Sequence, residues 1–186
     1  MTGVQTCALP IFAIIAGTCG KIARDVSLMM QTDVGEAFEP SGEGRGGSST
    51  MPHKNNPVRS VLIRRAALTA GPLAGTLHTA AAVSVDERAD GGWHAEWATL
   101  RDLVRRTLVA GSHAFDLVAE LEVHADRMSA TLGGARPGIL AEQQKMAELA
   151  GHQATAVYLG DAAAQVDAVL ERGRRGHRIA LVRHRR

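Results

Sequence analysis

A polar run inside residues 40–56 carries the side chains of this sequence that are best suited to chemistry. It contains Ser48, Ser49, Thr50, Lys54, Asn55 and Asn56. These groups stand directly before a predicted helix, whose N-terminal end carries roughly +0.5 charge and amide N–H groups without partners. Together with the ammonium of Lys54, that end would attract a carboxylate or a phosphate. The residue types therefore predict an anion-binding loop with groups capable of catalysis.

Glycines make the same segment unsuitable for a helix or a strand. They lie at Gly42, Gly44, Gly46 and Gly47. Glycine lets the backbone approach a ligand closely, and a mobile loop that closes over a bound anion excludes water. A P-loop does not fit, because its lysine is followed by Ser or Thr, whereas Lys54 precedes Asn55. A plain linker would explain the glycines, but it would not explain the polar run that follows them.

Apolar residues with helical spacing lie on both sides of this loop. The stripe before it consists of Ile15, Cys19, Ile22, Val26, Met29 and Met30. It predicts a helix from Phe12 to about Ala37, which ends before Pro40. After the loop, Asn56 suits an N-cap and Pro57 suits the first position of a second helix. The stripe of that helix consists of Val58, Leu62, Thr69, Leu73 and Leu77. We expect Gly71-Pro72 to kink or divide it.

A second break at residues 85–92 precedes a long third helix, predicted from Trp93 to about Leu121. Its apolar stripe consists of Trp93, Trp97, Leu100, Val104, Leu108, Phe115, Val118 and Leu121, and we expect the two tryptophans to lie in the core. Gly133-Gly134 and Arg136-Pro137-Gly138 are expected to end the next segment. Shorter helices are predicted at about 138–150 and 155–171, and no strand is predicted.

Composition agrees with a helical protein. The 186 residues are 45% hydrophobic and only 3% aromatic, and 31 of them are alanine. Strands favour aromatic and β-branched residues, so this composition favours closely packed helices over a β-sandwich. No apolar run approaches the ~20 residues of a membrane helix. The sequence therefore predicts an all-α fold and a protein that does not span a membrane.

Charge and cysteine content exclude other classes. Residues 172–186 contain seven arginines and no acidic residue, so the net charge of +2 leaves −5 for the rest of the chain. That remainder has no basic stripe with aromatic residues, which disfavours nucleic-acid binding. The cysteines, Cys7 and Cys19, give neither metal-ligand spacing nor a disulfide framework. A reduced, cytoplasmic location is expected, because no signal peptide is evident.

The run from Gly47 to Asn56, GSSTMPHKNN, resembles the signature GSSxMPxKxN of the fumarase/aspartase superfamily at all seven of its fixed positions. Flanking segments narrow the resemblance to the cycloisomerases that act on 3-carboxy-cis,cis-muconate. These segments are GKIARDVSL at residues 20–28, QTDVGE at residues 31–36 and ERADGGWHAEW at residues 87–97. The resemblance covers about residues 12–150, and more weakly residues 158–171.

The resemblance implies an all-α bundle of long helices in a homotetramer whose active sites are shared between subunits. The implied reaction adds a carboxylate to a C=C bond of 3-carboxy-cis,cis-muconate and gives a carboxymuconolactone, in the protocatechuate branch of the β-ketoadipate pathway. It implies a small polycarboxylate as substrate and no metal or organic cofactor. Nucleic-acid and membrane partners are not expected.

Site roles follow from the resemblance position by position. Ser48 corresponds to the proton-transfer serine, and Lys54 would stabilise the carbanion next to a carboxylate, so these two are the expected catalytic residues. Ser49, Thr50, Met51 and Asn56 are the expected substrate-binding residues. His53 occupies a variable position of the signature and is expected to face solvent. His94 and Glu96 are expected to have structural or interface roles, and Glu87 is expected to pair with Arg88.

The expected organisation has four parts. Residues 1–11 form a leader foreign to the native chain, and residues 12–131 form the central bundle with the loop at 40–56. Residues 132–171 form part of a small C-terminal helical domain, and residues 172–186 form a basic tail that is disordered or non-native. We expect the partner acid or base to come from a preceding region that this chain lacks.

Three alternatives to the cycloisomerase stay open from the residues alone. One is a lyase that resembles adenylosuccinate or argininosuccinate lyase and performs β-elimination. Another is an inactive helical assembly module, because Asn55 and Asp86 stand where the family has arginine and histidine. The third is a polyanion-binding protein that acts through the arginine-rich tail.

Overall fold

The computed structural model describes residues 3–40, 46–47, 51, 54–85, 90–151 and 161–183 of the chain. Helices account for most of these residues, which confirms the all-α prediction. The chain divides into two compact units between Thr131 and Leu132. Within the described ranges, no helix combines the length and the apolarity needed to cross a bilayer.

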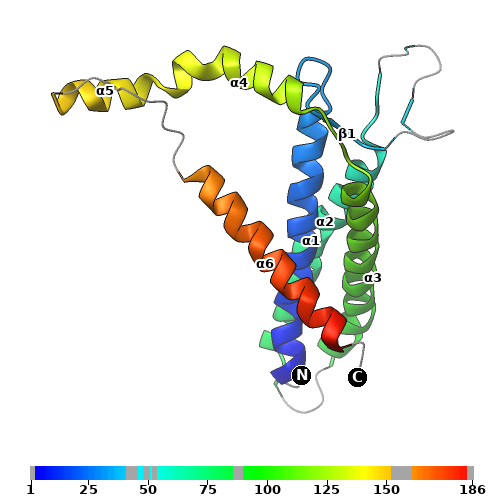
Figure 1. Cartoon of the computed structure of the whole chain (residues 1–186). Coiled ribbons are helices and arrows are strands. Elements are labelled where there is room, and N and C mark those ends of the chain that lie inside the picture. Colours follow the sequence, from blue (N-terminus) through cyan, green and yellow to red (C-terminus); the bar gives the residue numbers. More distant parts are fainter. Residues whose placement is uncertain are drawn as a thin grey trace. The chain divides into compact units, whose positions relative to one another are not determined.

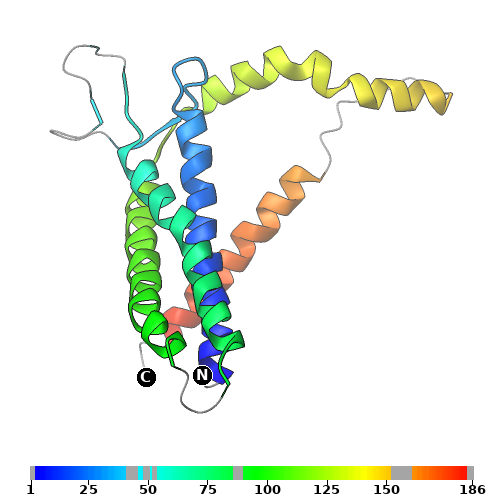
Figure 2. The same ribbon diagram turned by 180° about the vertical axis from the view of Figure 1, so that it is seen from behind.

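Three long helices form the first unit: α1 (Gly3–Met29), α2 (Val58–Ala82) and α3 (Gly92–Ala119). Each of them packs against the other two. Figures 1 and 2 show them side by side, with α2 antiparallel to α1 and α3. Strand β1 (Ala37–Phe38), which precedes the loop, and the first turn of α2, which follows it, therefore lie at the end of the bundle where α1 ends.

Alanine dominates the interior between these helices. One buried cluster contains Ala23, Val26, Met30, Ile63, Ala66, Ala110, Ala114 and Leu117. A second, further from the end of α1, contains Leu9, Ala16, Ala70, Ala74, Leu77 and Leu103. Small side chains let helix axes approach closely, so the buried alanines fit the tight packing of this unit.

The predicted apolar stripe of α3 is not the face that the bundle buries. The buried residues are Leu103, Thr107, Ala110, Ala114 and Leu117. The large residues of the predicted stripe are mostly exposed instead, with exposed fractions of 62% for Trp97, 66% for Leu108 and 75% for Phe115. The prediction that Trp93 and Trp97 lie in the core is therefore wrong for this chain. The helix has two apolar faces, and the alanine-rich face fits the close approach of α1 and α2.

Helix α1 begins and ends earlier than predicted. Its backbone is helical from Gly3, and Leu9 is buried in the second cluster, although residues 1–11 showed no helical period. It ends at Met29 rather than near Ala37. A turn follows in which Gly35 has a φ of 61° and the N–H of Glu36 donates to the carbonyl of Met29. A residue in this left-handed conformation cannot be part of an α-helix, so the helix cannot extend through Gly35 to Ala37 as predicted.

Two proline- or glycine-containing segments are more helical than predicted. Helix α2 runs unbroken through Gly71-Pro72, and α4 (Ala125–Ile139) runs through Gly133, Gly134 and Pro137. The absence of strands is also not complete, because β1 pairs with β2 (Glu122–Val123) in antiparallel register, with Ala37 opposite Val123. Helix α2 packs against α1 and α3, and β1 pairs with β2, so tertiary contacts override weak local propensity in these two places.

The second unit, residues 132–186, contains α5 (Ala141–Leu149) and α6 (Ala162–Arg183). Helix α6 begins later than predicted and takes in most of the arginine-rich tail, whose backbone is helical as far as Arg183. An ion pair joins Glu171 to Arg175 one turn further along α6. None of the side chains described in this unit is buried.

Helices α1 and α2 approach each other closely at Gly20. A Cβ atom added at Gly20 would lie 2.5 Å from the Cβ of Ala67. A Cβ added at Gly17, one turn earlier, would meet nothing within 4 Å. A side chain would therefore collide with α2 at Gly20 but not at Gly17, although both glycines lie on α1.

We expect Gly20→Ala to lower the free energy of unfolding by about 1–3 kcal/mol, because the two helices must separate. Gly17→Ala should raise it by up to about 1 kcal/mol, because alanine has the higher helix propensity. Urea unfolding of both variants, followed by circular dichroism, measures the difference. Shifts of the same sign in the two variants would contradict the close contact at Ala67.

Candidate active site

The N-terminal stem of the loop at 40–56 is held by three sets of contacts. Residues 37–38 pair with β2, and the N–H of His124 donates to the carbonyl of Glu36 over 2.9 Å. The guanidinium of Arg127 donates to the carbonyls of Val34 and Asp33, at 2.9 and 3.0 Å. These bonds connect the turn after α1 to the segment after α3. The loop therefore begins from a fixed position at this end of the bundle.

The carboxylate of Glu39 occupies the N-terminal end of α2. Its Oε2 atom accepts from the N–H of Arg59 over 2.9 Å, and its Oε1 atom accepts from the N–H of Ser60 over 2.7 Å. The N–H of Val58 donates to the carbonyl of Asn56. Glu39 thus performs the capping that the sequence assigned to Asn56, and the N-cap position is Pro57.

This cap corrects one expectation about the site. The free N–H groups of α2 were expected to attract the substrate anion, but the first three of them already donate within the chain. The negative charge of Glu39 also offsets the positive potential at the helix end. A substrate carboxylate must therefore find its positive partner elsewhere. Arg59 already pairs with Glu120, which leaves the side chain of Lys54 as the candidate on the loop.

A pocket of about 420 Å³ lies between the end of α1 and the C-terminal half of the loop. It is lined by Ser27, Met30, Gln31, Thr32, Met51, Lys54, Asn55 and Pro57. Lys54 is the charged residue of this lining. Ser27 and Thr32 offer hydroxyl groups, and Gln31 and Asn55 offer side-chain amide groups. Such a lining suits a small anion that carries several oxygen atoms.

The structure brings together part of the predicted site. Met51 and Lys54 line the pocket, and the N–H of Lys54 donates to the carbonyl of Met51 over 3.0 Å. The N–H of Asn56 donates to the carbonyl of Gly46 over 2.7 Å, which joins the two sides of the loop. Ser48, Ser49, Thr50 and His53 lie outside the described residues. Their predicted roles stay predictions.

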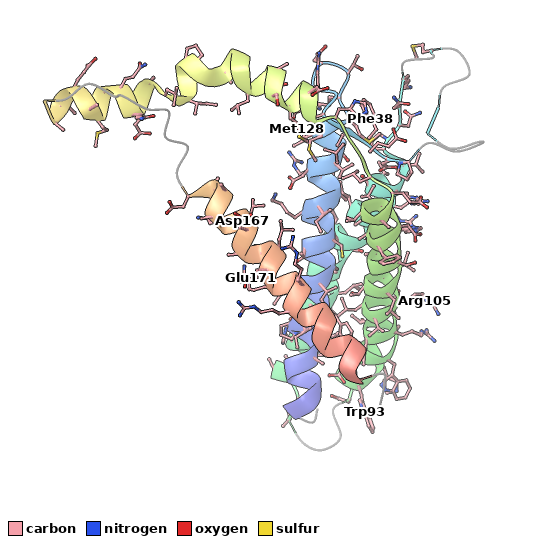
Figure 3. The ribbon with its side chains drawn as sticks, viewed as in Figure 1. Phe38, Trp93, Arg105, Met128, Asp167 and Glu171 are labelled. Atoms are coloured by element: carbon pink, nitrogen blue, oxygen red, sulfur yellow. The ribbon has the colours of Figure 1, made fainter. Side chains whose placement is uncertain are left out.

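Other residues singled out in the sequence lie away from this pocket. Figure 3 shows Trp93 at the opposite end of the bundle from Phe38, which precedes the loop. The rings of Trp93 and His94 each lie close to Trp97, with centroid distances of 6.2 and 5.2 Å. Glu87 and Arg88 lie outside the described residues. Across the described residues, no three His, Cys, Asp or Glu side chains group as a metal site would require.

Sequence reasoning missed four residues of this region: Ser27, Gln31, Thr32 and Glu39. The first three line the pocket from the end of α1 and the turn after it. They lie within or beside the segments that carry the family resemblance, but no spacing in the sequence places them opposite Lys54. Glu39 is separated from its partners by 20 and 21 residues, so no local pattern identifies it as a cap.

Comparison with known proteins places this site in a family. A sequence model of the lyase family matches residues 6–70, which include the loop. A crystal structure of 3-carboxy-cis,cis-muconate lactonizing enzyme from Pseudomonas putida has a TM-score of 0.60 and 40% identity, over 67% of this chain and 26% of that one. The chain therefore belongs to the fumarase/aspartase, or fumarate lyase, superfamily, as its signature predicted.

Two curated relatives have about half of their matched residues identical to those of this chain. The chain is 54% identical over 135 residues to 3-carboxy-cis,cis-muconate cycloisomerase of Bradyrhizobium diazoefficiens, which is 73% of this chain and 30% of the relative. It is 48% identical over 122 residues to nitrosuccinate lyase of Streptomyces davaonensis, which is 66% of this chain and 26% of the relative. The chain thus spans about 30% of the length of the curated relatives that it matches.

Proposed function

We propose that this chain provides the signature-loop part of a 3-carboxy-cis,cis-muconate cycloisomerase. The reaction is an isomerisation: a carboxylate oxygen of the substrate bonds to a carbon of the C=C bond, and the neighbouring carbon takes up a proton. The product is a carboxymuconolactone, and the reverse step is an elimination. The identity of 54% to the Bradyrhizobium diazoefficiens enzyme favours this substrate. We place the reaction in the cytoplasm, in the protocatechuate branch of the β-ketoadipate pathway.

The observation that carries this proposal is the pocket beside the loop, in which Lys54 is the charged residue among the described lining residues. A substrate with three carboxylates needs a positive group near the carbon that gains electrons. When that carbon becomes a carbanion next to a carboxylate, the two negative charges lie close together. An ammonium group in a site that excludes water stabilises this dianionic intermediate far better than an ammonium group in bulk water does. Ser27, Gln31 and Thr32 would orient the remaining carboxylate oxygens through neutral hydrogen bonds.

The roles proposed for the loop follow the signature. Ser48 transfers the proton at the reacting carbon, and Lys54 neutralises the intermediate. Ser49, Thr50, Met51 and Asn56 bind the carboxylates through side-chain or backbone groups. Because a serine hydroxyl is a weak base, this assignment requires a positive neighbour, and Lys54 lies six residues further along the same loop.

A β-elimination lyase is the second candidate. The identity of 48% over 122 residues to a nitrosuccinate lyase supports it. Elimination and lactonisation share a carbanion next to a carboxylate, so the same loop serves both. The substrate then depends on residues beyond the signature.

Reciprocal chimeras distinguish the two candidates. In the first chimera, the 135 matched residues of this chain replace their counterparts in the Bradyrhizobium diazoefficiens cycloisomerase. In the second, the 122 matched residues replace theirs in the Streptomyces davaonensis lyase. We expect the first chimera to consume 3-carboxy-cis,cis-muconate, seen as loss of diene absorbance, and the second to be much less active on nitrosuccinate. The opposite pattern would establish the lyase, and two folded but inactive chimeras would establish the assembly module.

The partner that we propose for the bundle is further copies of the same protein, in a homotetramer with shared active sites. Helix α3 exposes Trp97, Leu108, Phe115 and Val118, and α1 exposes Ile11, Ile14 and Ile15. Large apolar residues gathered on exposed helix faces favour burial against another subunit. Figure 3 shows Arg105 pointing away from the bundle on the same helix, α3.

We expect Leu108→Asp to reduce the tetrameric first chimera to smaller species at micromolar concentration, because a charge would be buried in the interface. Sedimentation velocity measures the change. Gln144→Asp, on the exposed surface of α5, introduces the same charge and should leave the assembly intact. An unchanged tetramer in Leu108→Asp would remove this face from the interface.

A further inference from the structure

We propose that Glu39 is a positioning residue for the signature loop: its carboxylate fixes the distance between the two stems of the loop, and through them the placement of the loop's catalytic groups. The inference rests on the proposed function for what the loop does. The contacts that carry it do not depend on the substrate. They join residues on opposite sides of the loop, which a purely local helix cap does not do.

The carboxylate of Glu39 accepts hydrogen bonds through both of its oxygen atoms. Each of its oxygen atoms accepts from a different backbone N–H, at 2.9 Å from Arg59 and 2.7 Å from Ser60. Such charge-assisted bonds are roughly twice as strong as neutral ones. Two bonds from consecutive amides also fix the orientation of the carboxylate, so Glu39 cannot slide along α2 without losing one of them.

Both partners of this contact are themselves held in place. Glu39 directly follows β1, whose residues pair with β2 and whose Phe38 ring lies 5.1 Å from the ring of His124. Ser60 is fully buried, and the guanidinium of Arg59 lies 3.6 Å from the carboxylate of Glu120 at the end of α3. The carboxylate thus connects two rigid parts of the bundle across the base of the loop.

A separate hydrogen bond joins the two sides of the loop, and its strength depends on the spacing between them. The N–H of Asn56 donates to the carbonyl of Gly46 over 2.7 Å, and neither residue bonds to Glu39. If Glu39 only caps α2, its removal leaves this bond unchanged. If it sets the spacing of the stems, its removal weakens this bond as well. The hydrogen-exchange rate of the Asn56 amide therefore distinguishes a Glu39 that positions the loop from a Glu39 that only caps α2.

Hydrogen exchange in the 186-residue chain, followed by NMR, tests the inference in Glu39→Gln. Glutamine retains the length of the side chain, but it has one acceptor oxygen and no charge. We expect the Arg59, Ser60 and Asn56 amides to exchange about five- to tenfold faster, while the amide of the buried Ile63 changes by less than about twofold. Glu36→Gln is the matched control, because it removes a carboxylate three residues earlier, whereas the amides of Arg59 and Ser60 donate to Glu39.

Faster exchange at Arg59 and Ser60 alone, with Asn56 unchanged, would reduce Glu39 to a helix cap and overturn the inference. Equal effects of Glu36→Gln and Glu39→Gln would overturn it too. These outcomes need no activity, so they are independent of the proposed reaction. An inactive first chimera would contradict the proposed function and leave the exchange result standing.

The kinetic consequence is measured in the first chimera. Misplacement of a catalytic group by about 1 Å can cost up to about 10²-fold in rate. We expect Glu39→Gln to lower kcat about 10- to 100-fold per correctly folded site, with a smaller change in KM. A variant with normal kcat and altered exchange at Asn56 would show that stem spacing does not govern the reacting groups, and it would overturn the catalytic part of the inference.

Discussion

Replacing Ser48 by alanine is expected to lower the kcat of the first chimera about 10³-fold, within the range that a positioned proton-transfer group contributes. The reason is specific to the chemistry. Lactonisation must deliver a proton to the carbon next to the new C–O bond, and the reverse elimination must remove it. Without the hydroxyl, Lys54 and the amides of the loop still stabilise the intermediate, but the proton has no positioned donor.

Ser49→Ala is the matched control for Ser48→Ala. It removes the same atoms from the neighbouring residue of the signature, where a substrate-binding role predicts an effect mainly on KM. The rate of diene loss at saturating substrate measures kcat for both variants. If Ser48→Ala retains kcat within about tenfold, the hydroxyl does not transfer the proton. A large loss of kcat in Ser49→Ala instead would exchange the two roles.

Replacing Lys54 by methionine is expected to lower kcat/KM about 10²- to 10³-fold, the range seen when one preorganised donor to a developing negative charge is removed. Glu39 already engages the α2 amides, so the helix end offers little compensation. The other described residues that line the pocket are uncharged. The loss should therefore be nearly as large as the whole contribution of the ammonium group.

Two further variants define the origin of that loss. Lys21→Met removes the same charge from an exposed lysine of α1 that pairs with Asp25, and it should leave kcat/KM within about twofold, since exposed ion pairs contribute little. Lys54→Arg retains the charge in a planar group of different shape, and we expect partial activity. Equal values of kcat/KM for Lys54→Met and Lys21→Met would show that Lys54 acts only through net charge.

Glu39 and Lys54 have complementary electrostatic roles in this arrangement. The negative charge of Glu39 offsets the positive potential at the N-terminal end of α2, and the ammonium of Lys54 supplies positive charge to the pocket. We therefore expect a substrate anion to be bound by the side chain of Lys54 rather than by the helix end.

Local patterns were sufficient for the class of fold and for the superfamily. Helical spacing and alanine content predicted the long helices, and the ten residues from Gly47 to Asn56 predicted the superfamily. Both signals lie within short windows of the chain, where backbone propensity and the chemical requirements of the reaction act directly. The approximate limits of α2 and α3 followed from the same signals.

Only the tertiary structure decided which apolar face of α3 is buried, which group caps α2 and which residues lie opposite Lys54. On α3, close packing selected Ala110 and Ala114 over the larger Leu108 and Phe115, because the spacing between helix axes favours small side chains. The cap came from Glu39, and the pairing of β1 with β2 joined segments on either side of two helices. Contacts between residues far apart in the chain depend on how all the helices pack at once, so no window of sequence contains them.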